Sequence, residues 1–398
     1  MKKVLKYNTQ SLLQSIFINL VSLCFCAFVP LCIIFLYPPS MMGKTLLKPE
    51  IKAPETITSI IFPASISWQN NILPEKNCTT VIDNFIYIIT SNNTLVSINL
   101  QDGKTTILSD ERFNNVKQIS SYDSTLLLLG NKDFFSLSAK NFQFKKLLGF
   151  DSAIVDTKLI NDSIIILMEN AIATYNLTTN KYFSFSYDTE LHFFSILPYD
   201  SDIIALTNDG KIIRYSYEGQ IKWQLTLPTP ITVHGVINKP VLYQPSGTYL
   251  YAIDVNNSHI KWKLLLGAES HLPPLISNNN IYITPLNNLL YRLDHKGNKK
   301  WIKLLDYRIT TQILDINDEL IVTPFSQEIL SISKKSGNNI NSFKTDTLYL
   351  IKMFFINESL ILLYPDKIIC LKKEIPKPEE VPAKEPDMQD AKSQNTVP

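Results

Sequence analysis

Two aspartates, Asp254 and Asp294, are the residues best suited to paired acid–base chemistry, because each follows a short apolar segment of similar sequence. Other copies of the same segment end in Asn99 or Ser138, which cannot act as carboxylic acids. An Asp, Asn or Ser at the end of a strand commonly hydrogen-bonds the backbone of the following turn. We therefore expect these residues to support turns, and we predict no catalytic residue.

Five histidines are the other candidates for chemistry, here as metal ligands: His192, His234, His259, His271 and His295. They are spread along the chain without the short spacing that a zinc site usually shows. We predict no metal site and no bound cofactor.

The segments that carry these residues return at a nearly constant interval. Their last residues are Asn99, Ser138, Asn176, Ser216, Asp254, Asp294 and Ser333, at steps of 39, 38, 40, 38, 40 and 39 residues. A period of about 40 residues made of short strands is typical of a β-propeller, in which each repeat is one blade.

Three copies continue in the same way, through a turn into a strand that holds a tryptophan. Trp223, Trp262 and Trp301 are 39 residues apart, and Gly219 and Gly297 fall in the preceding turns of the first and third copies. Glycine supplies the positive φ that a tight hairpin needs. In less regular copies Phe144, Tyr182 and Ile340 fall near the tryptophan position.

An eighth copy ends at Leu371 without its last strand. The segment around Trp68 matches the missing strand, and residues 64–374 hold 311 residues, close to eight units of 39. Closure by this N-terminal strand would remove the free sheet edges. We predict an all-β fold: an eight-bladed propeller, expected to be a monomeric ring. Its structural repeat positions are Trp68, Asn99, Asn176, Trp223, Asp254, Trp262, Asp294 and Trp301.

An apolar run precedes the repeats. From Ile16 to Tyr37 the chain has 22 residues without a charge, enough to cross about 30 Å of hydrocarbon as a helix. Lys2, Lys3 and Lys6 precede the run, so the positive-inside rule sends the repeats out of the cytoplasm. We expect a transmembrane signal anchor; cleavage as a signal peptide and lipidation of a cysteine remain alternatives.

The predicted organisation has five parts. These are a basic cytoplasmic N-terminus (1–14), a transmembrane segment (15–37), a Pro-containing spacer (38–63), the propeller (64–374) and a disordered Pro/Glu/Lys tail (375–398). Cys78 and Cys370 fall in the first and last blades, so a disulfide between them is an open alternative. A net charge of +2 disfavours nucleic-acid binding.

The repeats resemble the pyrroloquinoline-quinone-type family, whose blades read hydrophobic-Tyr-Ala-hydrophobic-Asp, a turn with Gly, then Trp. The segment from Tyr251 to Trp262 fits this pattern closely. The resemblance implies that the tryptophans dock neighbouring blades together. It does not imply the quinone cofactor.

Two groups of proteins share these repeats: the quinoprotein dehydrogenases and the propeller subunit of the machine that assembles outer-membrane β-barrels. The chain is similar to the second in its size and minimal blades. The resemblance implies a non-catalytic scaffold outside the cytoplasm, periplasmic in a Gram-negative cell, with an envelope protein such as a β-barrel assembly protein as partner. The alternatives are a membrane-anchored quinone-dependent oxidoreductase and a propeller that senses a small ligand.

Overall fold

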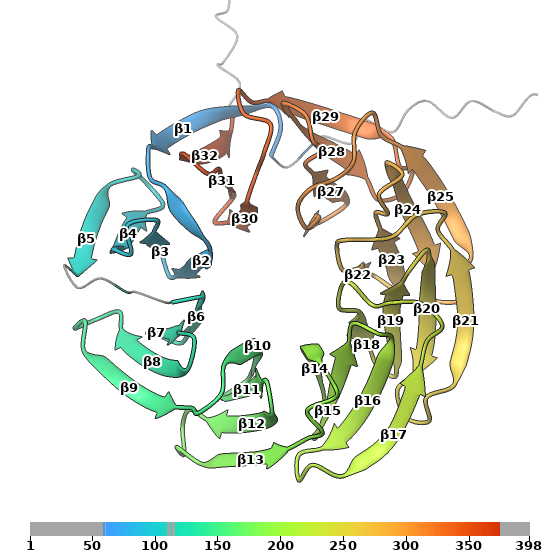
Figure 1. Cartoon of the computed structure of the whole chain (residues 1–398). Helices are drawn as coiled ribbons and strands as arrows, with labels where there is room; N and C mark the ends of the chain where they lie inside the picture. The colour runs from blue at the N-terminus through green and yellow to red at the C-terminus, as the bar shows by residue number, and fades with distance from the viewer. Residues whose placement is uncertain (1–58, 60, 110–112, 114–115, 375–398) are drawn as a thin grey trace, which may run out of the picture. The chain divides into compact units, whose positions relative to one another are not determined.

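The 39-residue period corresponds to a four-stranded antiparallel sheet, repeated eight times around a ring (Figure 1). The computed structural model describes residues 59, 61–109, 113 and 116–374, all within one unit, Ile57–Pro398. These residues contain 32 strands. The prediction of an all-β, eight-bladed propeller is confirmed.

The first four blades follow one another along the chain. Their strands are β2 (Pro74–Ile82), β3 (Phe85–Thr90), β4 (Leu95–Asn99) and β5 (Thr105–Ser109) in blade 1; β6 (Gln118–Tyr122), β7 (Thr125–Leu129), β8 (Asp133–Ser138) and β9 (Phe144–Gly149) in blade 2; β10 (Ile154–Ile160), β11 (Ser163–Met168), β12 (Ala171–Asn176) and β13 (Tyr182–Ser186) in blade 3; and β14 (Phe193–Tyr199), β15 (Asp202–Thr207), β16 (Lys211–Ser216) and β17 (Ile221–Thr226) in blade 4.

The other four blades complete the ring, and the last one combines both ends of the propeller. Their strands are β18 (Val236–Asn238), β19 (Val241–Ser246), β20 (Tyr249–Asp254) and β21 (Ile260–Leu265) in blade 5; β22 (Leu275–Ser277), β23 (Asn280–Ile283), β24 (Leu289–Asp294) and β25 (Lys299–Leu304) in blade 6; β26 (Leu314–Ile316), β27 (Glu319–Val322), β28 (Glu328–Ser333) and β29 (Asn339–Lys344) in blade 7; and β30 (Lys352–Ile356), β31 (Ser359–Leu363), β32 (Ile368–Lys373) and β1 (Ala64–Asn70) in blade 8.

The predicted closure by an N-terminal strand is confirmed. Strand β1 is the outermost strand of blade 8 and pairs antiparallel with β32, where Trp68 lies opposite Cys370. Because the first and last segments of the ring share one sheet, the ring opens only if their hydrogen bonds break.

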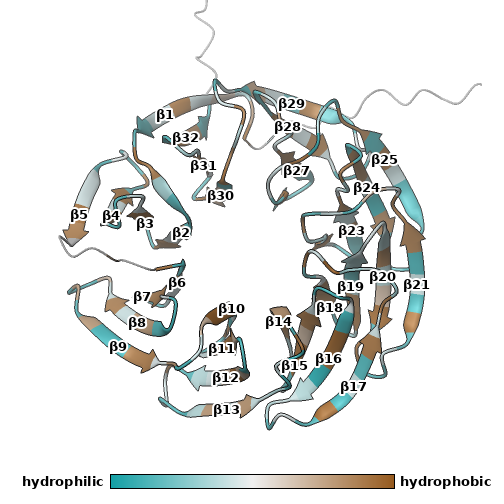
Figure 2. Ribbon diagram, viewed as in Figure 1, coloured by the Kyte–Doolittle hydropathy of each residue, from teal (hydrophilic) through white to brown (hydrophobic). Residues whose placement is uncertain are grey.

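The hydrophobic core lies between the blades. The central strands are buried on both faces, so β15 and β31 consist entirely of buried residues. The outermost strands alternate, as in β25, where Trp301 and Lys303 are half-buried and Ile302 and Leu304 are exposed. Figure 2 shows this alternation as brown and teal bands along β17, β21 and β25. Every blade thus buries both faces against its neighbours.

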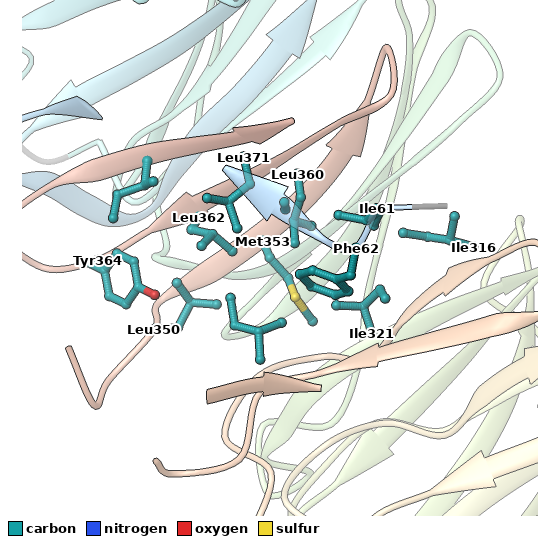
Figure 3. Close-up of a cluster of buried hydrophobic side chains, with 13 residues drawn as sticks. Ile61, Phe62, Ile316, Ile321, Leu350, Met353, Leu360, Leu362, Tyr364 and Leu371 are labelled. Atoms are coloured by element: carbon teal, nitrogen blue, oxygen red, sulfur yellow. The ribbon is translucent and has the colours of Figure 1, made fainter. Parts of the chain in front are cut away.

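The chain differs from the prediction just before β1, where the expected spacer reaches residue 63. Ile61 and Phe62 are 0% and 2% exposed, inserted among buried side chains of blades 7 and 8 (Figure 3). The Phe62 ring stacks on Phe343 at a centroid distance of 6.4 Å. Sequence reasoning placed these residues in the spacer because the surrounding prolines are typical of extended linkers.

A polar contact accompanies this insertion. Ser59 Oγ donates to Glu319 Oε2 at 2.7 Å, and Lys373 Nζ donates to Ser59 O at 2.7 Å. Glu319 is only 2% exposed, so the hydroxyl supplies part of the hydrogen bonding that a buried carboxylate requires. Ser59, Ile61 and Phe62 are therefore part of the interface between blades 7 and 8.

The predicted parts 1–14 and 15–37, most of 38–63, and the tail 375–398 lie outside the described residues. In the part of the chain that is described, no helix is both long enough and apolar enough to cross a membrane.

Cys78 and Cys370 are both buried free thiols, so the structure does not contain the disulfide considered above. They belong to different hydrophobic clusters, one between blades 1 and 2 and the other between blades 8 and 1. Burial, with a smaller contribution from Glu75, raises the pKa of Cys78 to about 12. Burial also raises the pKa of Cys370.

Candidate functional site

The aspartates at the repeat position hydrogen-bond the turns that follow them. Asp254 Oδ1 accepts from the backbone N–H of Asn256 at 3.0 Å, and Oδ2 lies 2.9 Å from Lys261 Nζ. The Lys261 hydrogen bond, followed by the Asn256 N–H, lowers the pKa of Asp254. A carboxylate held ionised in this way is poorly suited to acid–base catalysis at neutral pH.

Asp294 has the same surroundings one blade further on. Burial would raise its pKa, but hydrogen bonds from Asn298, Lys300 and Lys296 outweigh burial and hold it below the ordinary value. Asn99 and Asn176 occupy the position in blades 1 and 3, where their amide oxygens accept from the N–H groups of Gln101 and Thr178. The structure distributes these four residues over four blades and does not combine them into one site.

The four tryptophans at the other repeat positions each connect their own blade to the next, which covers four of the eight interfaces. In each case the indole N–H donates to the backbone carbonyl that follows the polar repeat residue of the next blade. The bonds are Trp68–Leu100 (3.0 Å), Trp223–Val255 (2.7 Å), Trp262–His295 (3.0 Å) and Trp301–Lys334 (2.9 Å). An indole N–H that is at least partly buried needs such a partner, so each bond joins two blades while the ring fills space between them. We call each contact a tryptophan interlock.

In three of these interlocks, the turn of the next blade packs against the indole at a glycine. At Gly337, with φ +75°, an added Cβ would lie 2.9 Å from Trp301, and at Gly297, with φ +83°, the same distance from Trp262. Gly103 has the same relation to Trp68. Glycine is required here both for the left-handed backbone and for the close approach of the ring.

Sequence reasoning missed two arginines that strengthen the interlocks. Arg214 Nη1 donates to Val255 O at 2.8 Å, the carbonyl that Trp223 also contacts. Arg292 Nη1 donates to Lys334 O at 2.6 Å, beside the bond from Trp301. Both arginines lie two residues before the polar repeat position, and this shared spacing was the available signal.

Blade 3 uses a different aromatic side chain from the one expected. Tyr182 is 45% exposed, and Phe185 instead lies against Gly219 of blade 4, where an added Cβ would be 2.6 Å from its ring. In the strand register, Phe183 faces Thr174 as Trp223 faces Arg214. A cavity of about 490 Å³ lies beside Phe183, with Tyr217 in its wall, so this interface is packed less completely.

The antiparallel order of each blade assigns its loops to two rims. Turns within the first and last strand pairs lie at one rim. Loops between the second and third strands, together with connections to the next blade, lie at the other, which we call the crossover rim. The crossover connections are the longer of the two kinds, for example residues 305–313 and 345–351. Long rim loops on a rigid scaffold are frequent sites of binding.

The crossover rim of blades 6 to 8 carries exposed apolar side chains, which we call the apolar rim patch. Its members and exposures are Leu304 (74%), Tyr307 (53%), Phe325 (39%), Leu348 (50%) and Tyr349 (44%). At the crossover rim of blades 1 to 4, the exposed described residues are mainly polar, for example Asn92, Asn131, Asp151 and Glu169. Contiguous exposed apolar side chains often mark an interaction site.

Hydrogen bonds connect the three segments that form the apolar rim patch. The Phe325 N–H donates to Arg308 O at 2.7 Å, and the Arg308 guanidinium lies 5.9 Å from the Phe325 ring centroid. On the other side, Gln327 Nε2 donates to Asp346 O at 3.2 Å. The loop around Phe325 is thus held between the two crossover connections that carry Tyr307 and Tyr349.

The described residues contain no group of three or more His, Cys, Asp or Glu side chains placed to hold a metal ion. The five histidines remain distributed over the ring, with His234 in the connection before β18 and His271 and His295 on blade 6 or its approach.

Residues 208–347 match the model of a family described as the outer membrane protein assembly factor BamB. The matched range begins in blade 4 and ends after blade 7, so it contains the interlocks of Trp223, Trp262 and Trp301. The resemblance to the pyrroloquinoline-quinone-type repeats is confirmed. No curated protein sequence matches the chain significantly.

Solved structures agree on the fold at low identity. The crystal structure of BamB from Moraxella catarrhalis is 12% identical, with a TM-score of 0.59 over 78% of this chain and 97% of that one. The computationally designed protein Ika8 (10% identity, TM-score 0.64, 76% and 99%) and Saccharomyces cerevisiae Sqt1 (10%, 0.62, 81% and 100%) are also similar. The chain is thus an eight-bladed propeller whose residues 208–347 are similar in sequence to the BamB family and whose fold is similar to that of BamB.

Proposed function

We propose that this protein is a non-catalytic scaffold that contributes to the assembly of outer-membrane β-barrel proteins. It is anchored in a membrane, and its propeller lies outside the cytoplasm. The apolar rim patch carries the proposal, because it exposes three aromatic rings and the Arg308 guanidinium lies beside one of them, Phe325. Tyr and Arg are enriched among the residues that dominate protein–protein affinity. The family match to an outer-membrane assembly factor indicates the process in which the partner acts.

The scaffold works by presenting a rigid face. Blades locked by tryptophan hydrogen bonds change little when a partner binds, so little ordering free energy opposes association. The partner is expected to be a component of the β-barrel assembly apparatus that places apolar side chains on Tyr307, Phe325 and Tyr349.

Site-specific photo-crosslinking in cells tests this function. A photoreactive phenylalanine analogue replaces Tyr307 or Tyr349, and the matched control replaces Phe142, which is 43% exposed at the opposite rim. We expect Tyr307 and Tyr349 positions to capture a β-barrel assembly protein several-fold more efficiently than the Phe142 position, as identified by mass spectrometry.

Two results would contradict the proposal. Equal capture from all three positions would show that the apolar rim patch is not the contact surface. Specific capture of an envelope protein without a role in barrel assembly would retain the scaffold and remove the assignment to outer-membrane assembly.

A further inference from the structure

A cavity of about 440 Å³ opens at the start of the innermost strands, where they leave the crossover rim for the centre of the ring. Six of the eight blades or their approaches contribute to its wall, from β2, β6, β10, β14, the connection before β18, and β30. Cavities of this size hold small organic ligands. The apolar rim patch shares no residue with it.

The lining is mainly polar. Side chains with amide or hydroxyl groups come from Asn77, Gln118, Ser195 and Thr232, and His234 adds an imidazole. His234 Nδ1 lies 3.0 Å from Gly235 O, a carbonyl that can only accept, so this nitrogen carries the proton in the neutral ring. The wall therefore offers the amide groups of Asn77 and Gln118 and the hydroxyl of Thr232 as hydrogen-bond donors around one space.

Asp156, the one carboxylate among the described residues of the wall, is fully engaged by protein groups. Its Oδ1 accepts from the Thr157 N–H at 2.8 Å and from Lys158 Nζ at 3.0 Å. Its Oδ2 accepts from Ser195 Oγ at 2.7 Å and from the Ile196 N–H at 3.1 Å. The Lys158 ammonium offsets the negative charge of Asp156. The bonds to Ser195 and Ile196 also connect β10 to β14, and both oxygens of Asp156 are occupied by protein groups.

Lys352, the second lysine in the wall, has no such partner among the described residues. Its amine lies 4.6 Å from the Phe354 ring centroid, and no described acidic group forms an ion pair with it. The side chain is open to the cavity, yet the surrounding wall desolvates the amine and lowers the pKa of Lys352. Among the described residues of the wall, the Lys352 amine is therefore the basic group without an acidic partner.

We propose that this cavity binds a small organic anion, with its carboxylate or phosphate group on Lys352 and its remaining atoms against the polar wall. Amines with neighbouring amide and hydroxyl donors are suited to both kinds of oxyanion. Phe194 and Val233 supply an apolar contact for the body of the ligand. The inference does not depend on the scaffold function.

Isothermal titration calorimetry of the full-length protein in detergent, at fixed ionic strength, tests the site. Citrate and inorganic phosphate are titrated separately, with glycerol as the uncharged comparison. We expect saturable binding of at least one anion with a Kd below about 1 mM, and none of glycerol. Citrate binding alone would identify a carboxylate ligand, and phosphate binding alone a phosphorylated one.

Lys352→Met, which retains the apolar stem and removes the charge, is expected to weaken binding at least tenfold. Asn77→Ala, a second exposed position in the wall, is expected to weaken it several-fold. Lys140→Met, at an exposed turn of the opposite rim, should leave the affinity unchanged. Absence of saturable binding by both anions, or equal affinity in Lys352→Met, would overturn the proposal.

Discussion

Blades 4 to 6 and blades 1 to 3 are built on the same strand order, yet they are held to their neighbours differently. Trp223, Trp262 and Trp301 each form an interlock with the following blade. At the corresponding register positions of blades 1 and 3 stand Thr106 and Phe183. The first group keeps the repeat pattern that matches the BamB family, and the second does not.

This difference shows that the ring does not need an interlock at every interface. Buried strands such as β11 supply enough apolar contact to keep blades 1 to 3 together. Where the interlock is present, it adds a hydrogen bond between two blades, and the Trp301 interlock joins blades 6 and 7, which carry part of the apolar rim patch. The tryptophans therefore add stability at particular interfaces of a ring that also closes where they are absent.

Loss of one interlock should have the largest effect. Trp301→Ala removes the hydrogen bond to Lys334 O and the contact with Tyr282, whose ring centroid lies 6.0 Å away. We expect a loss of about 3–5 kcal/mol in the free energy of unfolding. Urea unfolding followed by circular dichroism measures it.

Thr106→Ala, at the equivalent exposed position of blade 1, is the matched control. It should change the free energy of unfolding by no more than about 0.5 kcal/mol. Similar losses in the two variants would mean that interlocked and plain interfaces do not differ.

The glycine that lies on the indole should be the next most sensitive position. Gly337→Ala introduces a Cβ 2.9 Å from Trp301 at a φ of +75°, so both strain and overlap oppose it. We expect a loss of about 2–4 kcal/mol. Gly267→Ala has a φ of +83° but meets only Asn287 Nδ2, at 3.3 Å, and should lose about 1–2 kcal/mol. Equal losses of stability in Gly337→Ala and Gly267→Ala, measured by thermal unfolding, would show that overlap with the Trp301 ring contributes nothing.

An interlock placed in blade 3 should stabilise the ring. Phe183→Trp puts an indole beside the cavity near Tyr217, where its N–H has the backbone carbonyl of the next blade as a partner by analogy with Trp223. Filling such a cavity typically gains about 0.5–2 kcal/mol. Tyr182→Trp, one position out of register, is the control. A gain from the control alone would show that the register argument is wrong.

The smallest expected effect is on the stability of the folded protein at low pH. The pKa values of Asp254 and Asp294 are lowered in the folded protein, so their stabilisation is complete above the unfolded value of 3.8 and is lost as the pH falls further. The double variant with Asn at both positions places there the residue that blades 1 and 3 already use. Between pH 5 and about pH 3, its free energy of unfolding should fall by a few tenths of a kcal/mol less than that of the unmodified protein. Melting temperatures at the two pH values measure this. An unchanged pH profile would contradict the assignment.

Much of the fold could be predicted from the chain alone. The period of about 39 residues gave the blade count, and Trp68 identified the closing strand, because repeated local contacts leave a repeated local pattern. The role of the polar residue at the end of each repeat, which is to support the following turn, could also be predicted, because an Asx turn needs only the neighbouring backbone.

The sites could not be predicted in the same way. Tyr307, Phe325 and Tyr349 follow no repeat spacing, and only the ring brings their loops to one rim. The isolation of Lys352 is equally invisible in sequence, since it depends on which carboxylates lie nearby, and Asp156 turned out to be paired with Lys158. Ile61 and Phe62 entered the core for the same kind of reason, because a groove between blades 7 and 8 exists only in the closed ring.

The sequence by itself thus determined the repeating unit, the turn residues and the number of blades, which rest on contacts within about 40 residues. Tertiary structure alone decided which loops share the crossover rim, that Lys352 has no acidic partner among the described residues, and where Ile61 and Phe62 pack. Those features arise between blades, where residues far apart in the chain come into contact, and such contacts leave no periodic pattern in the sequence.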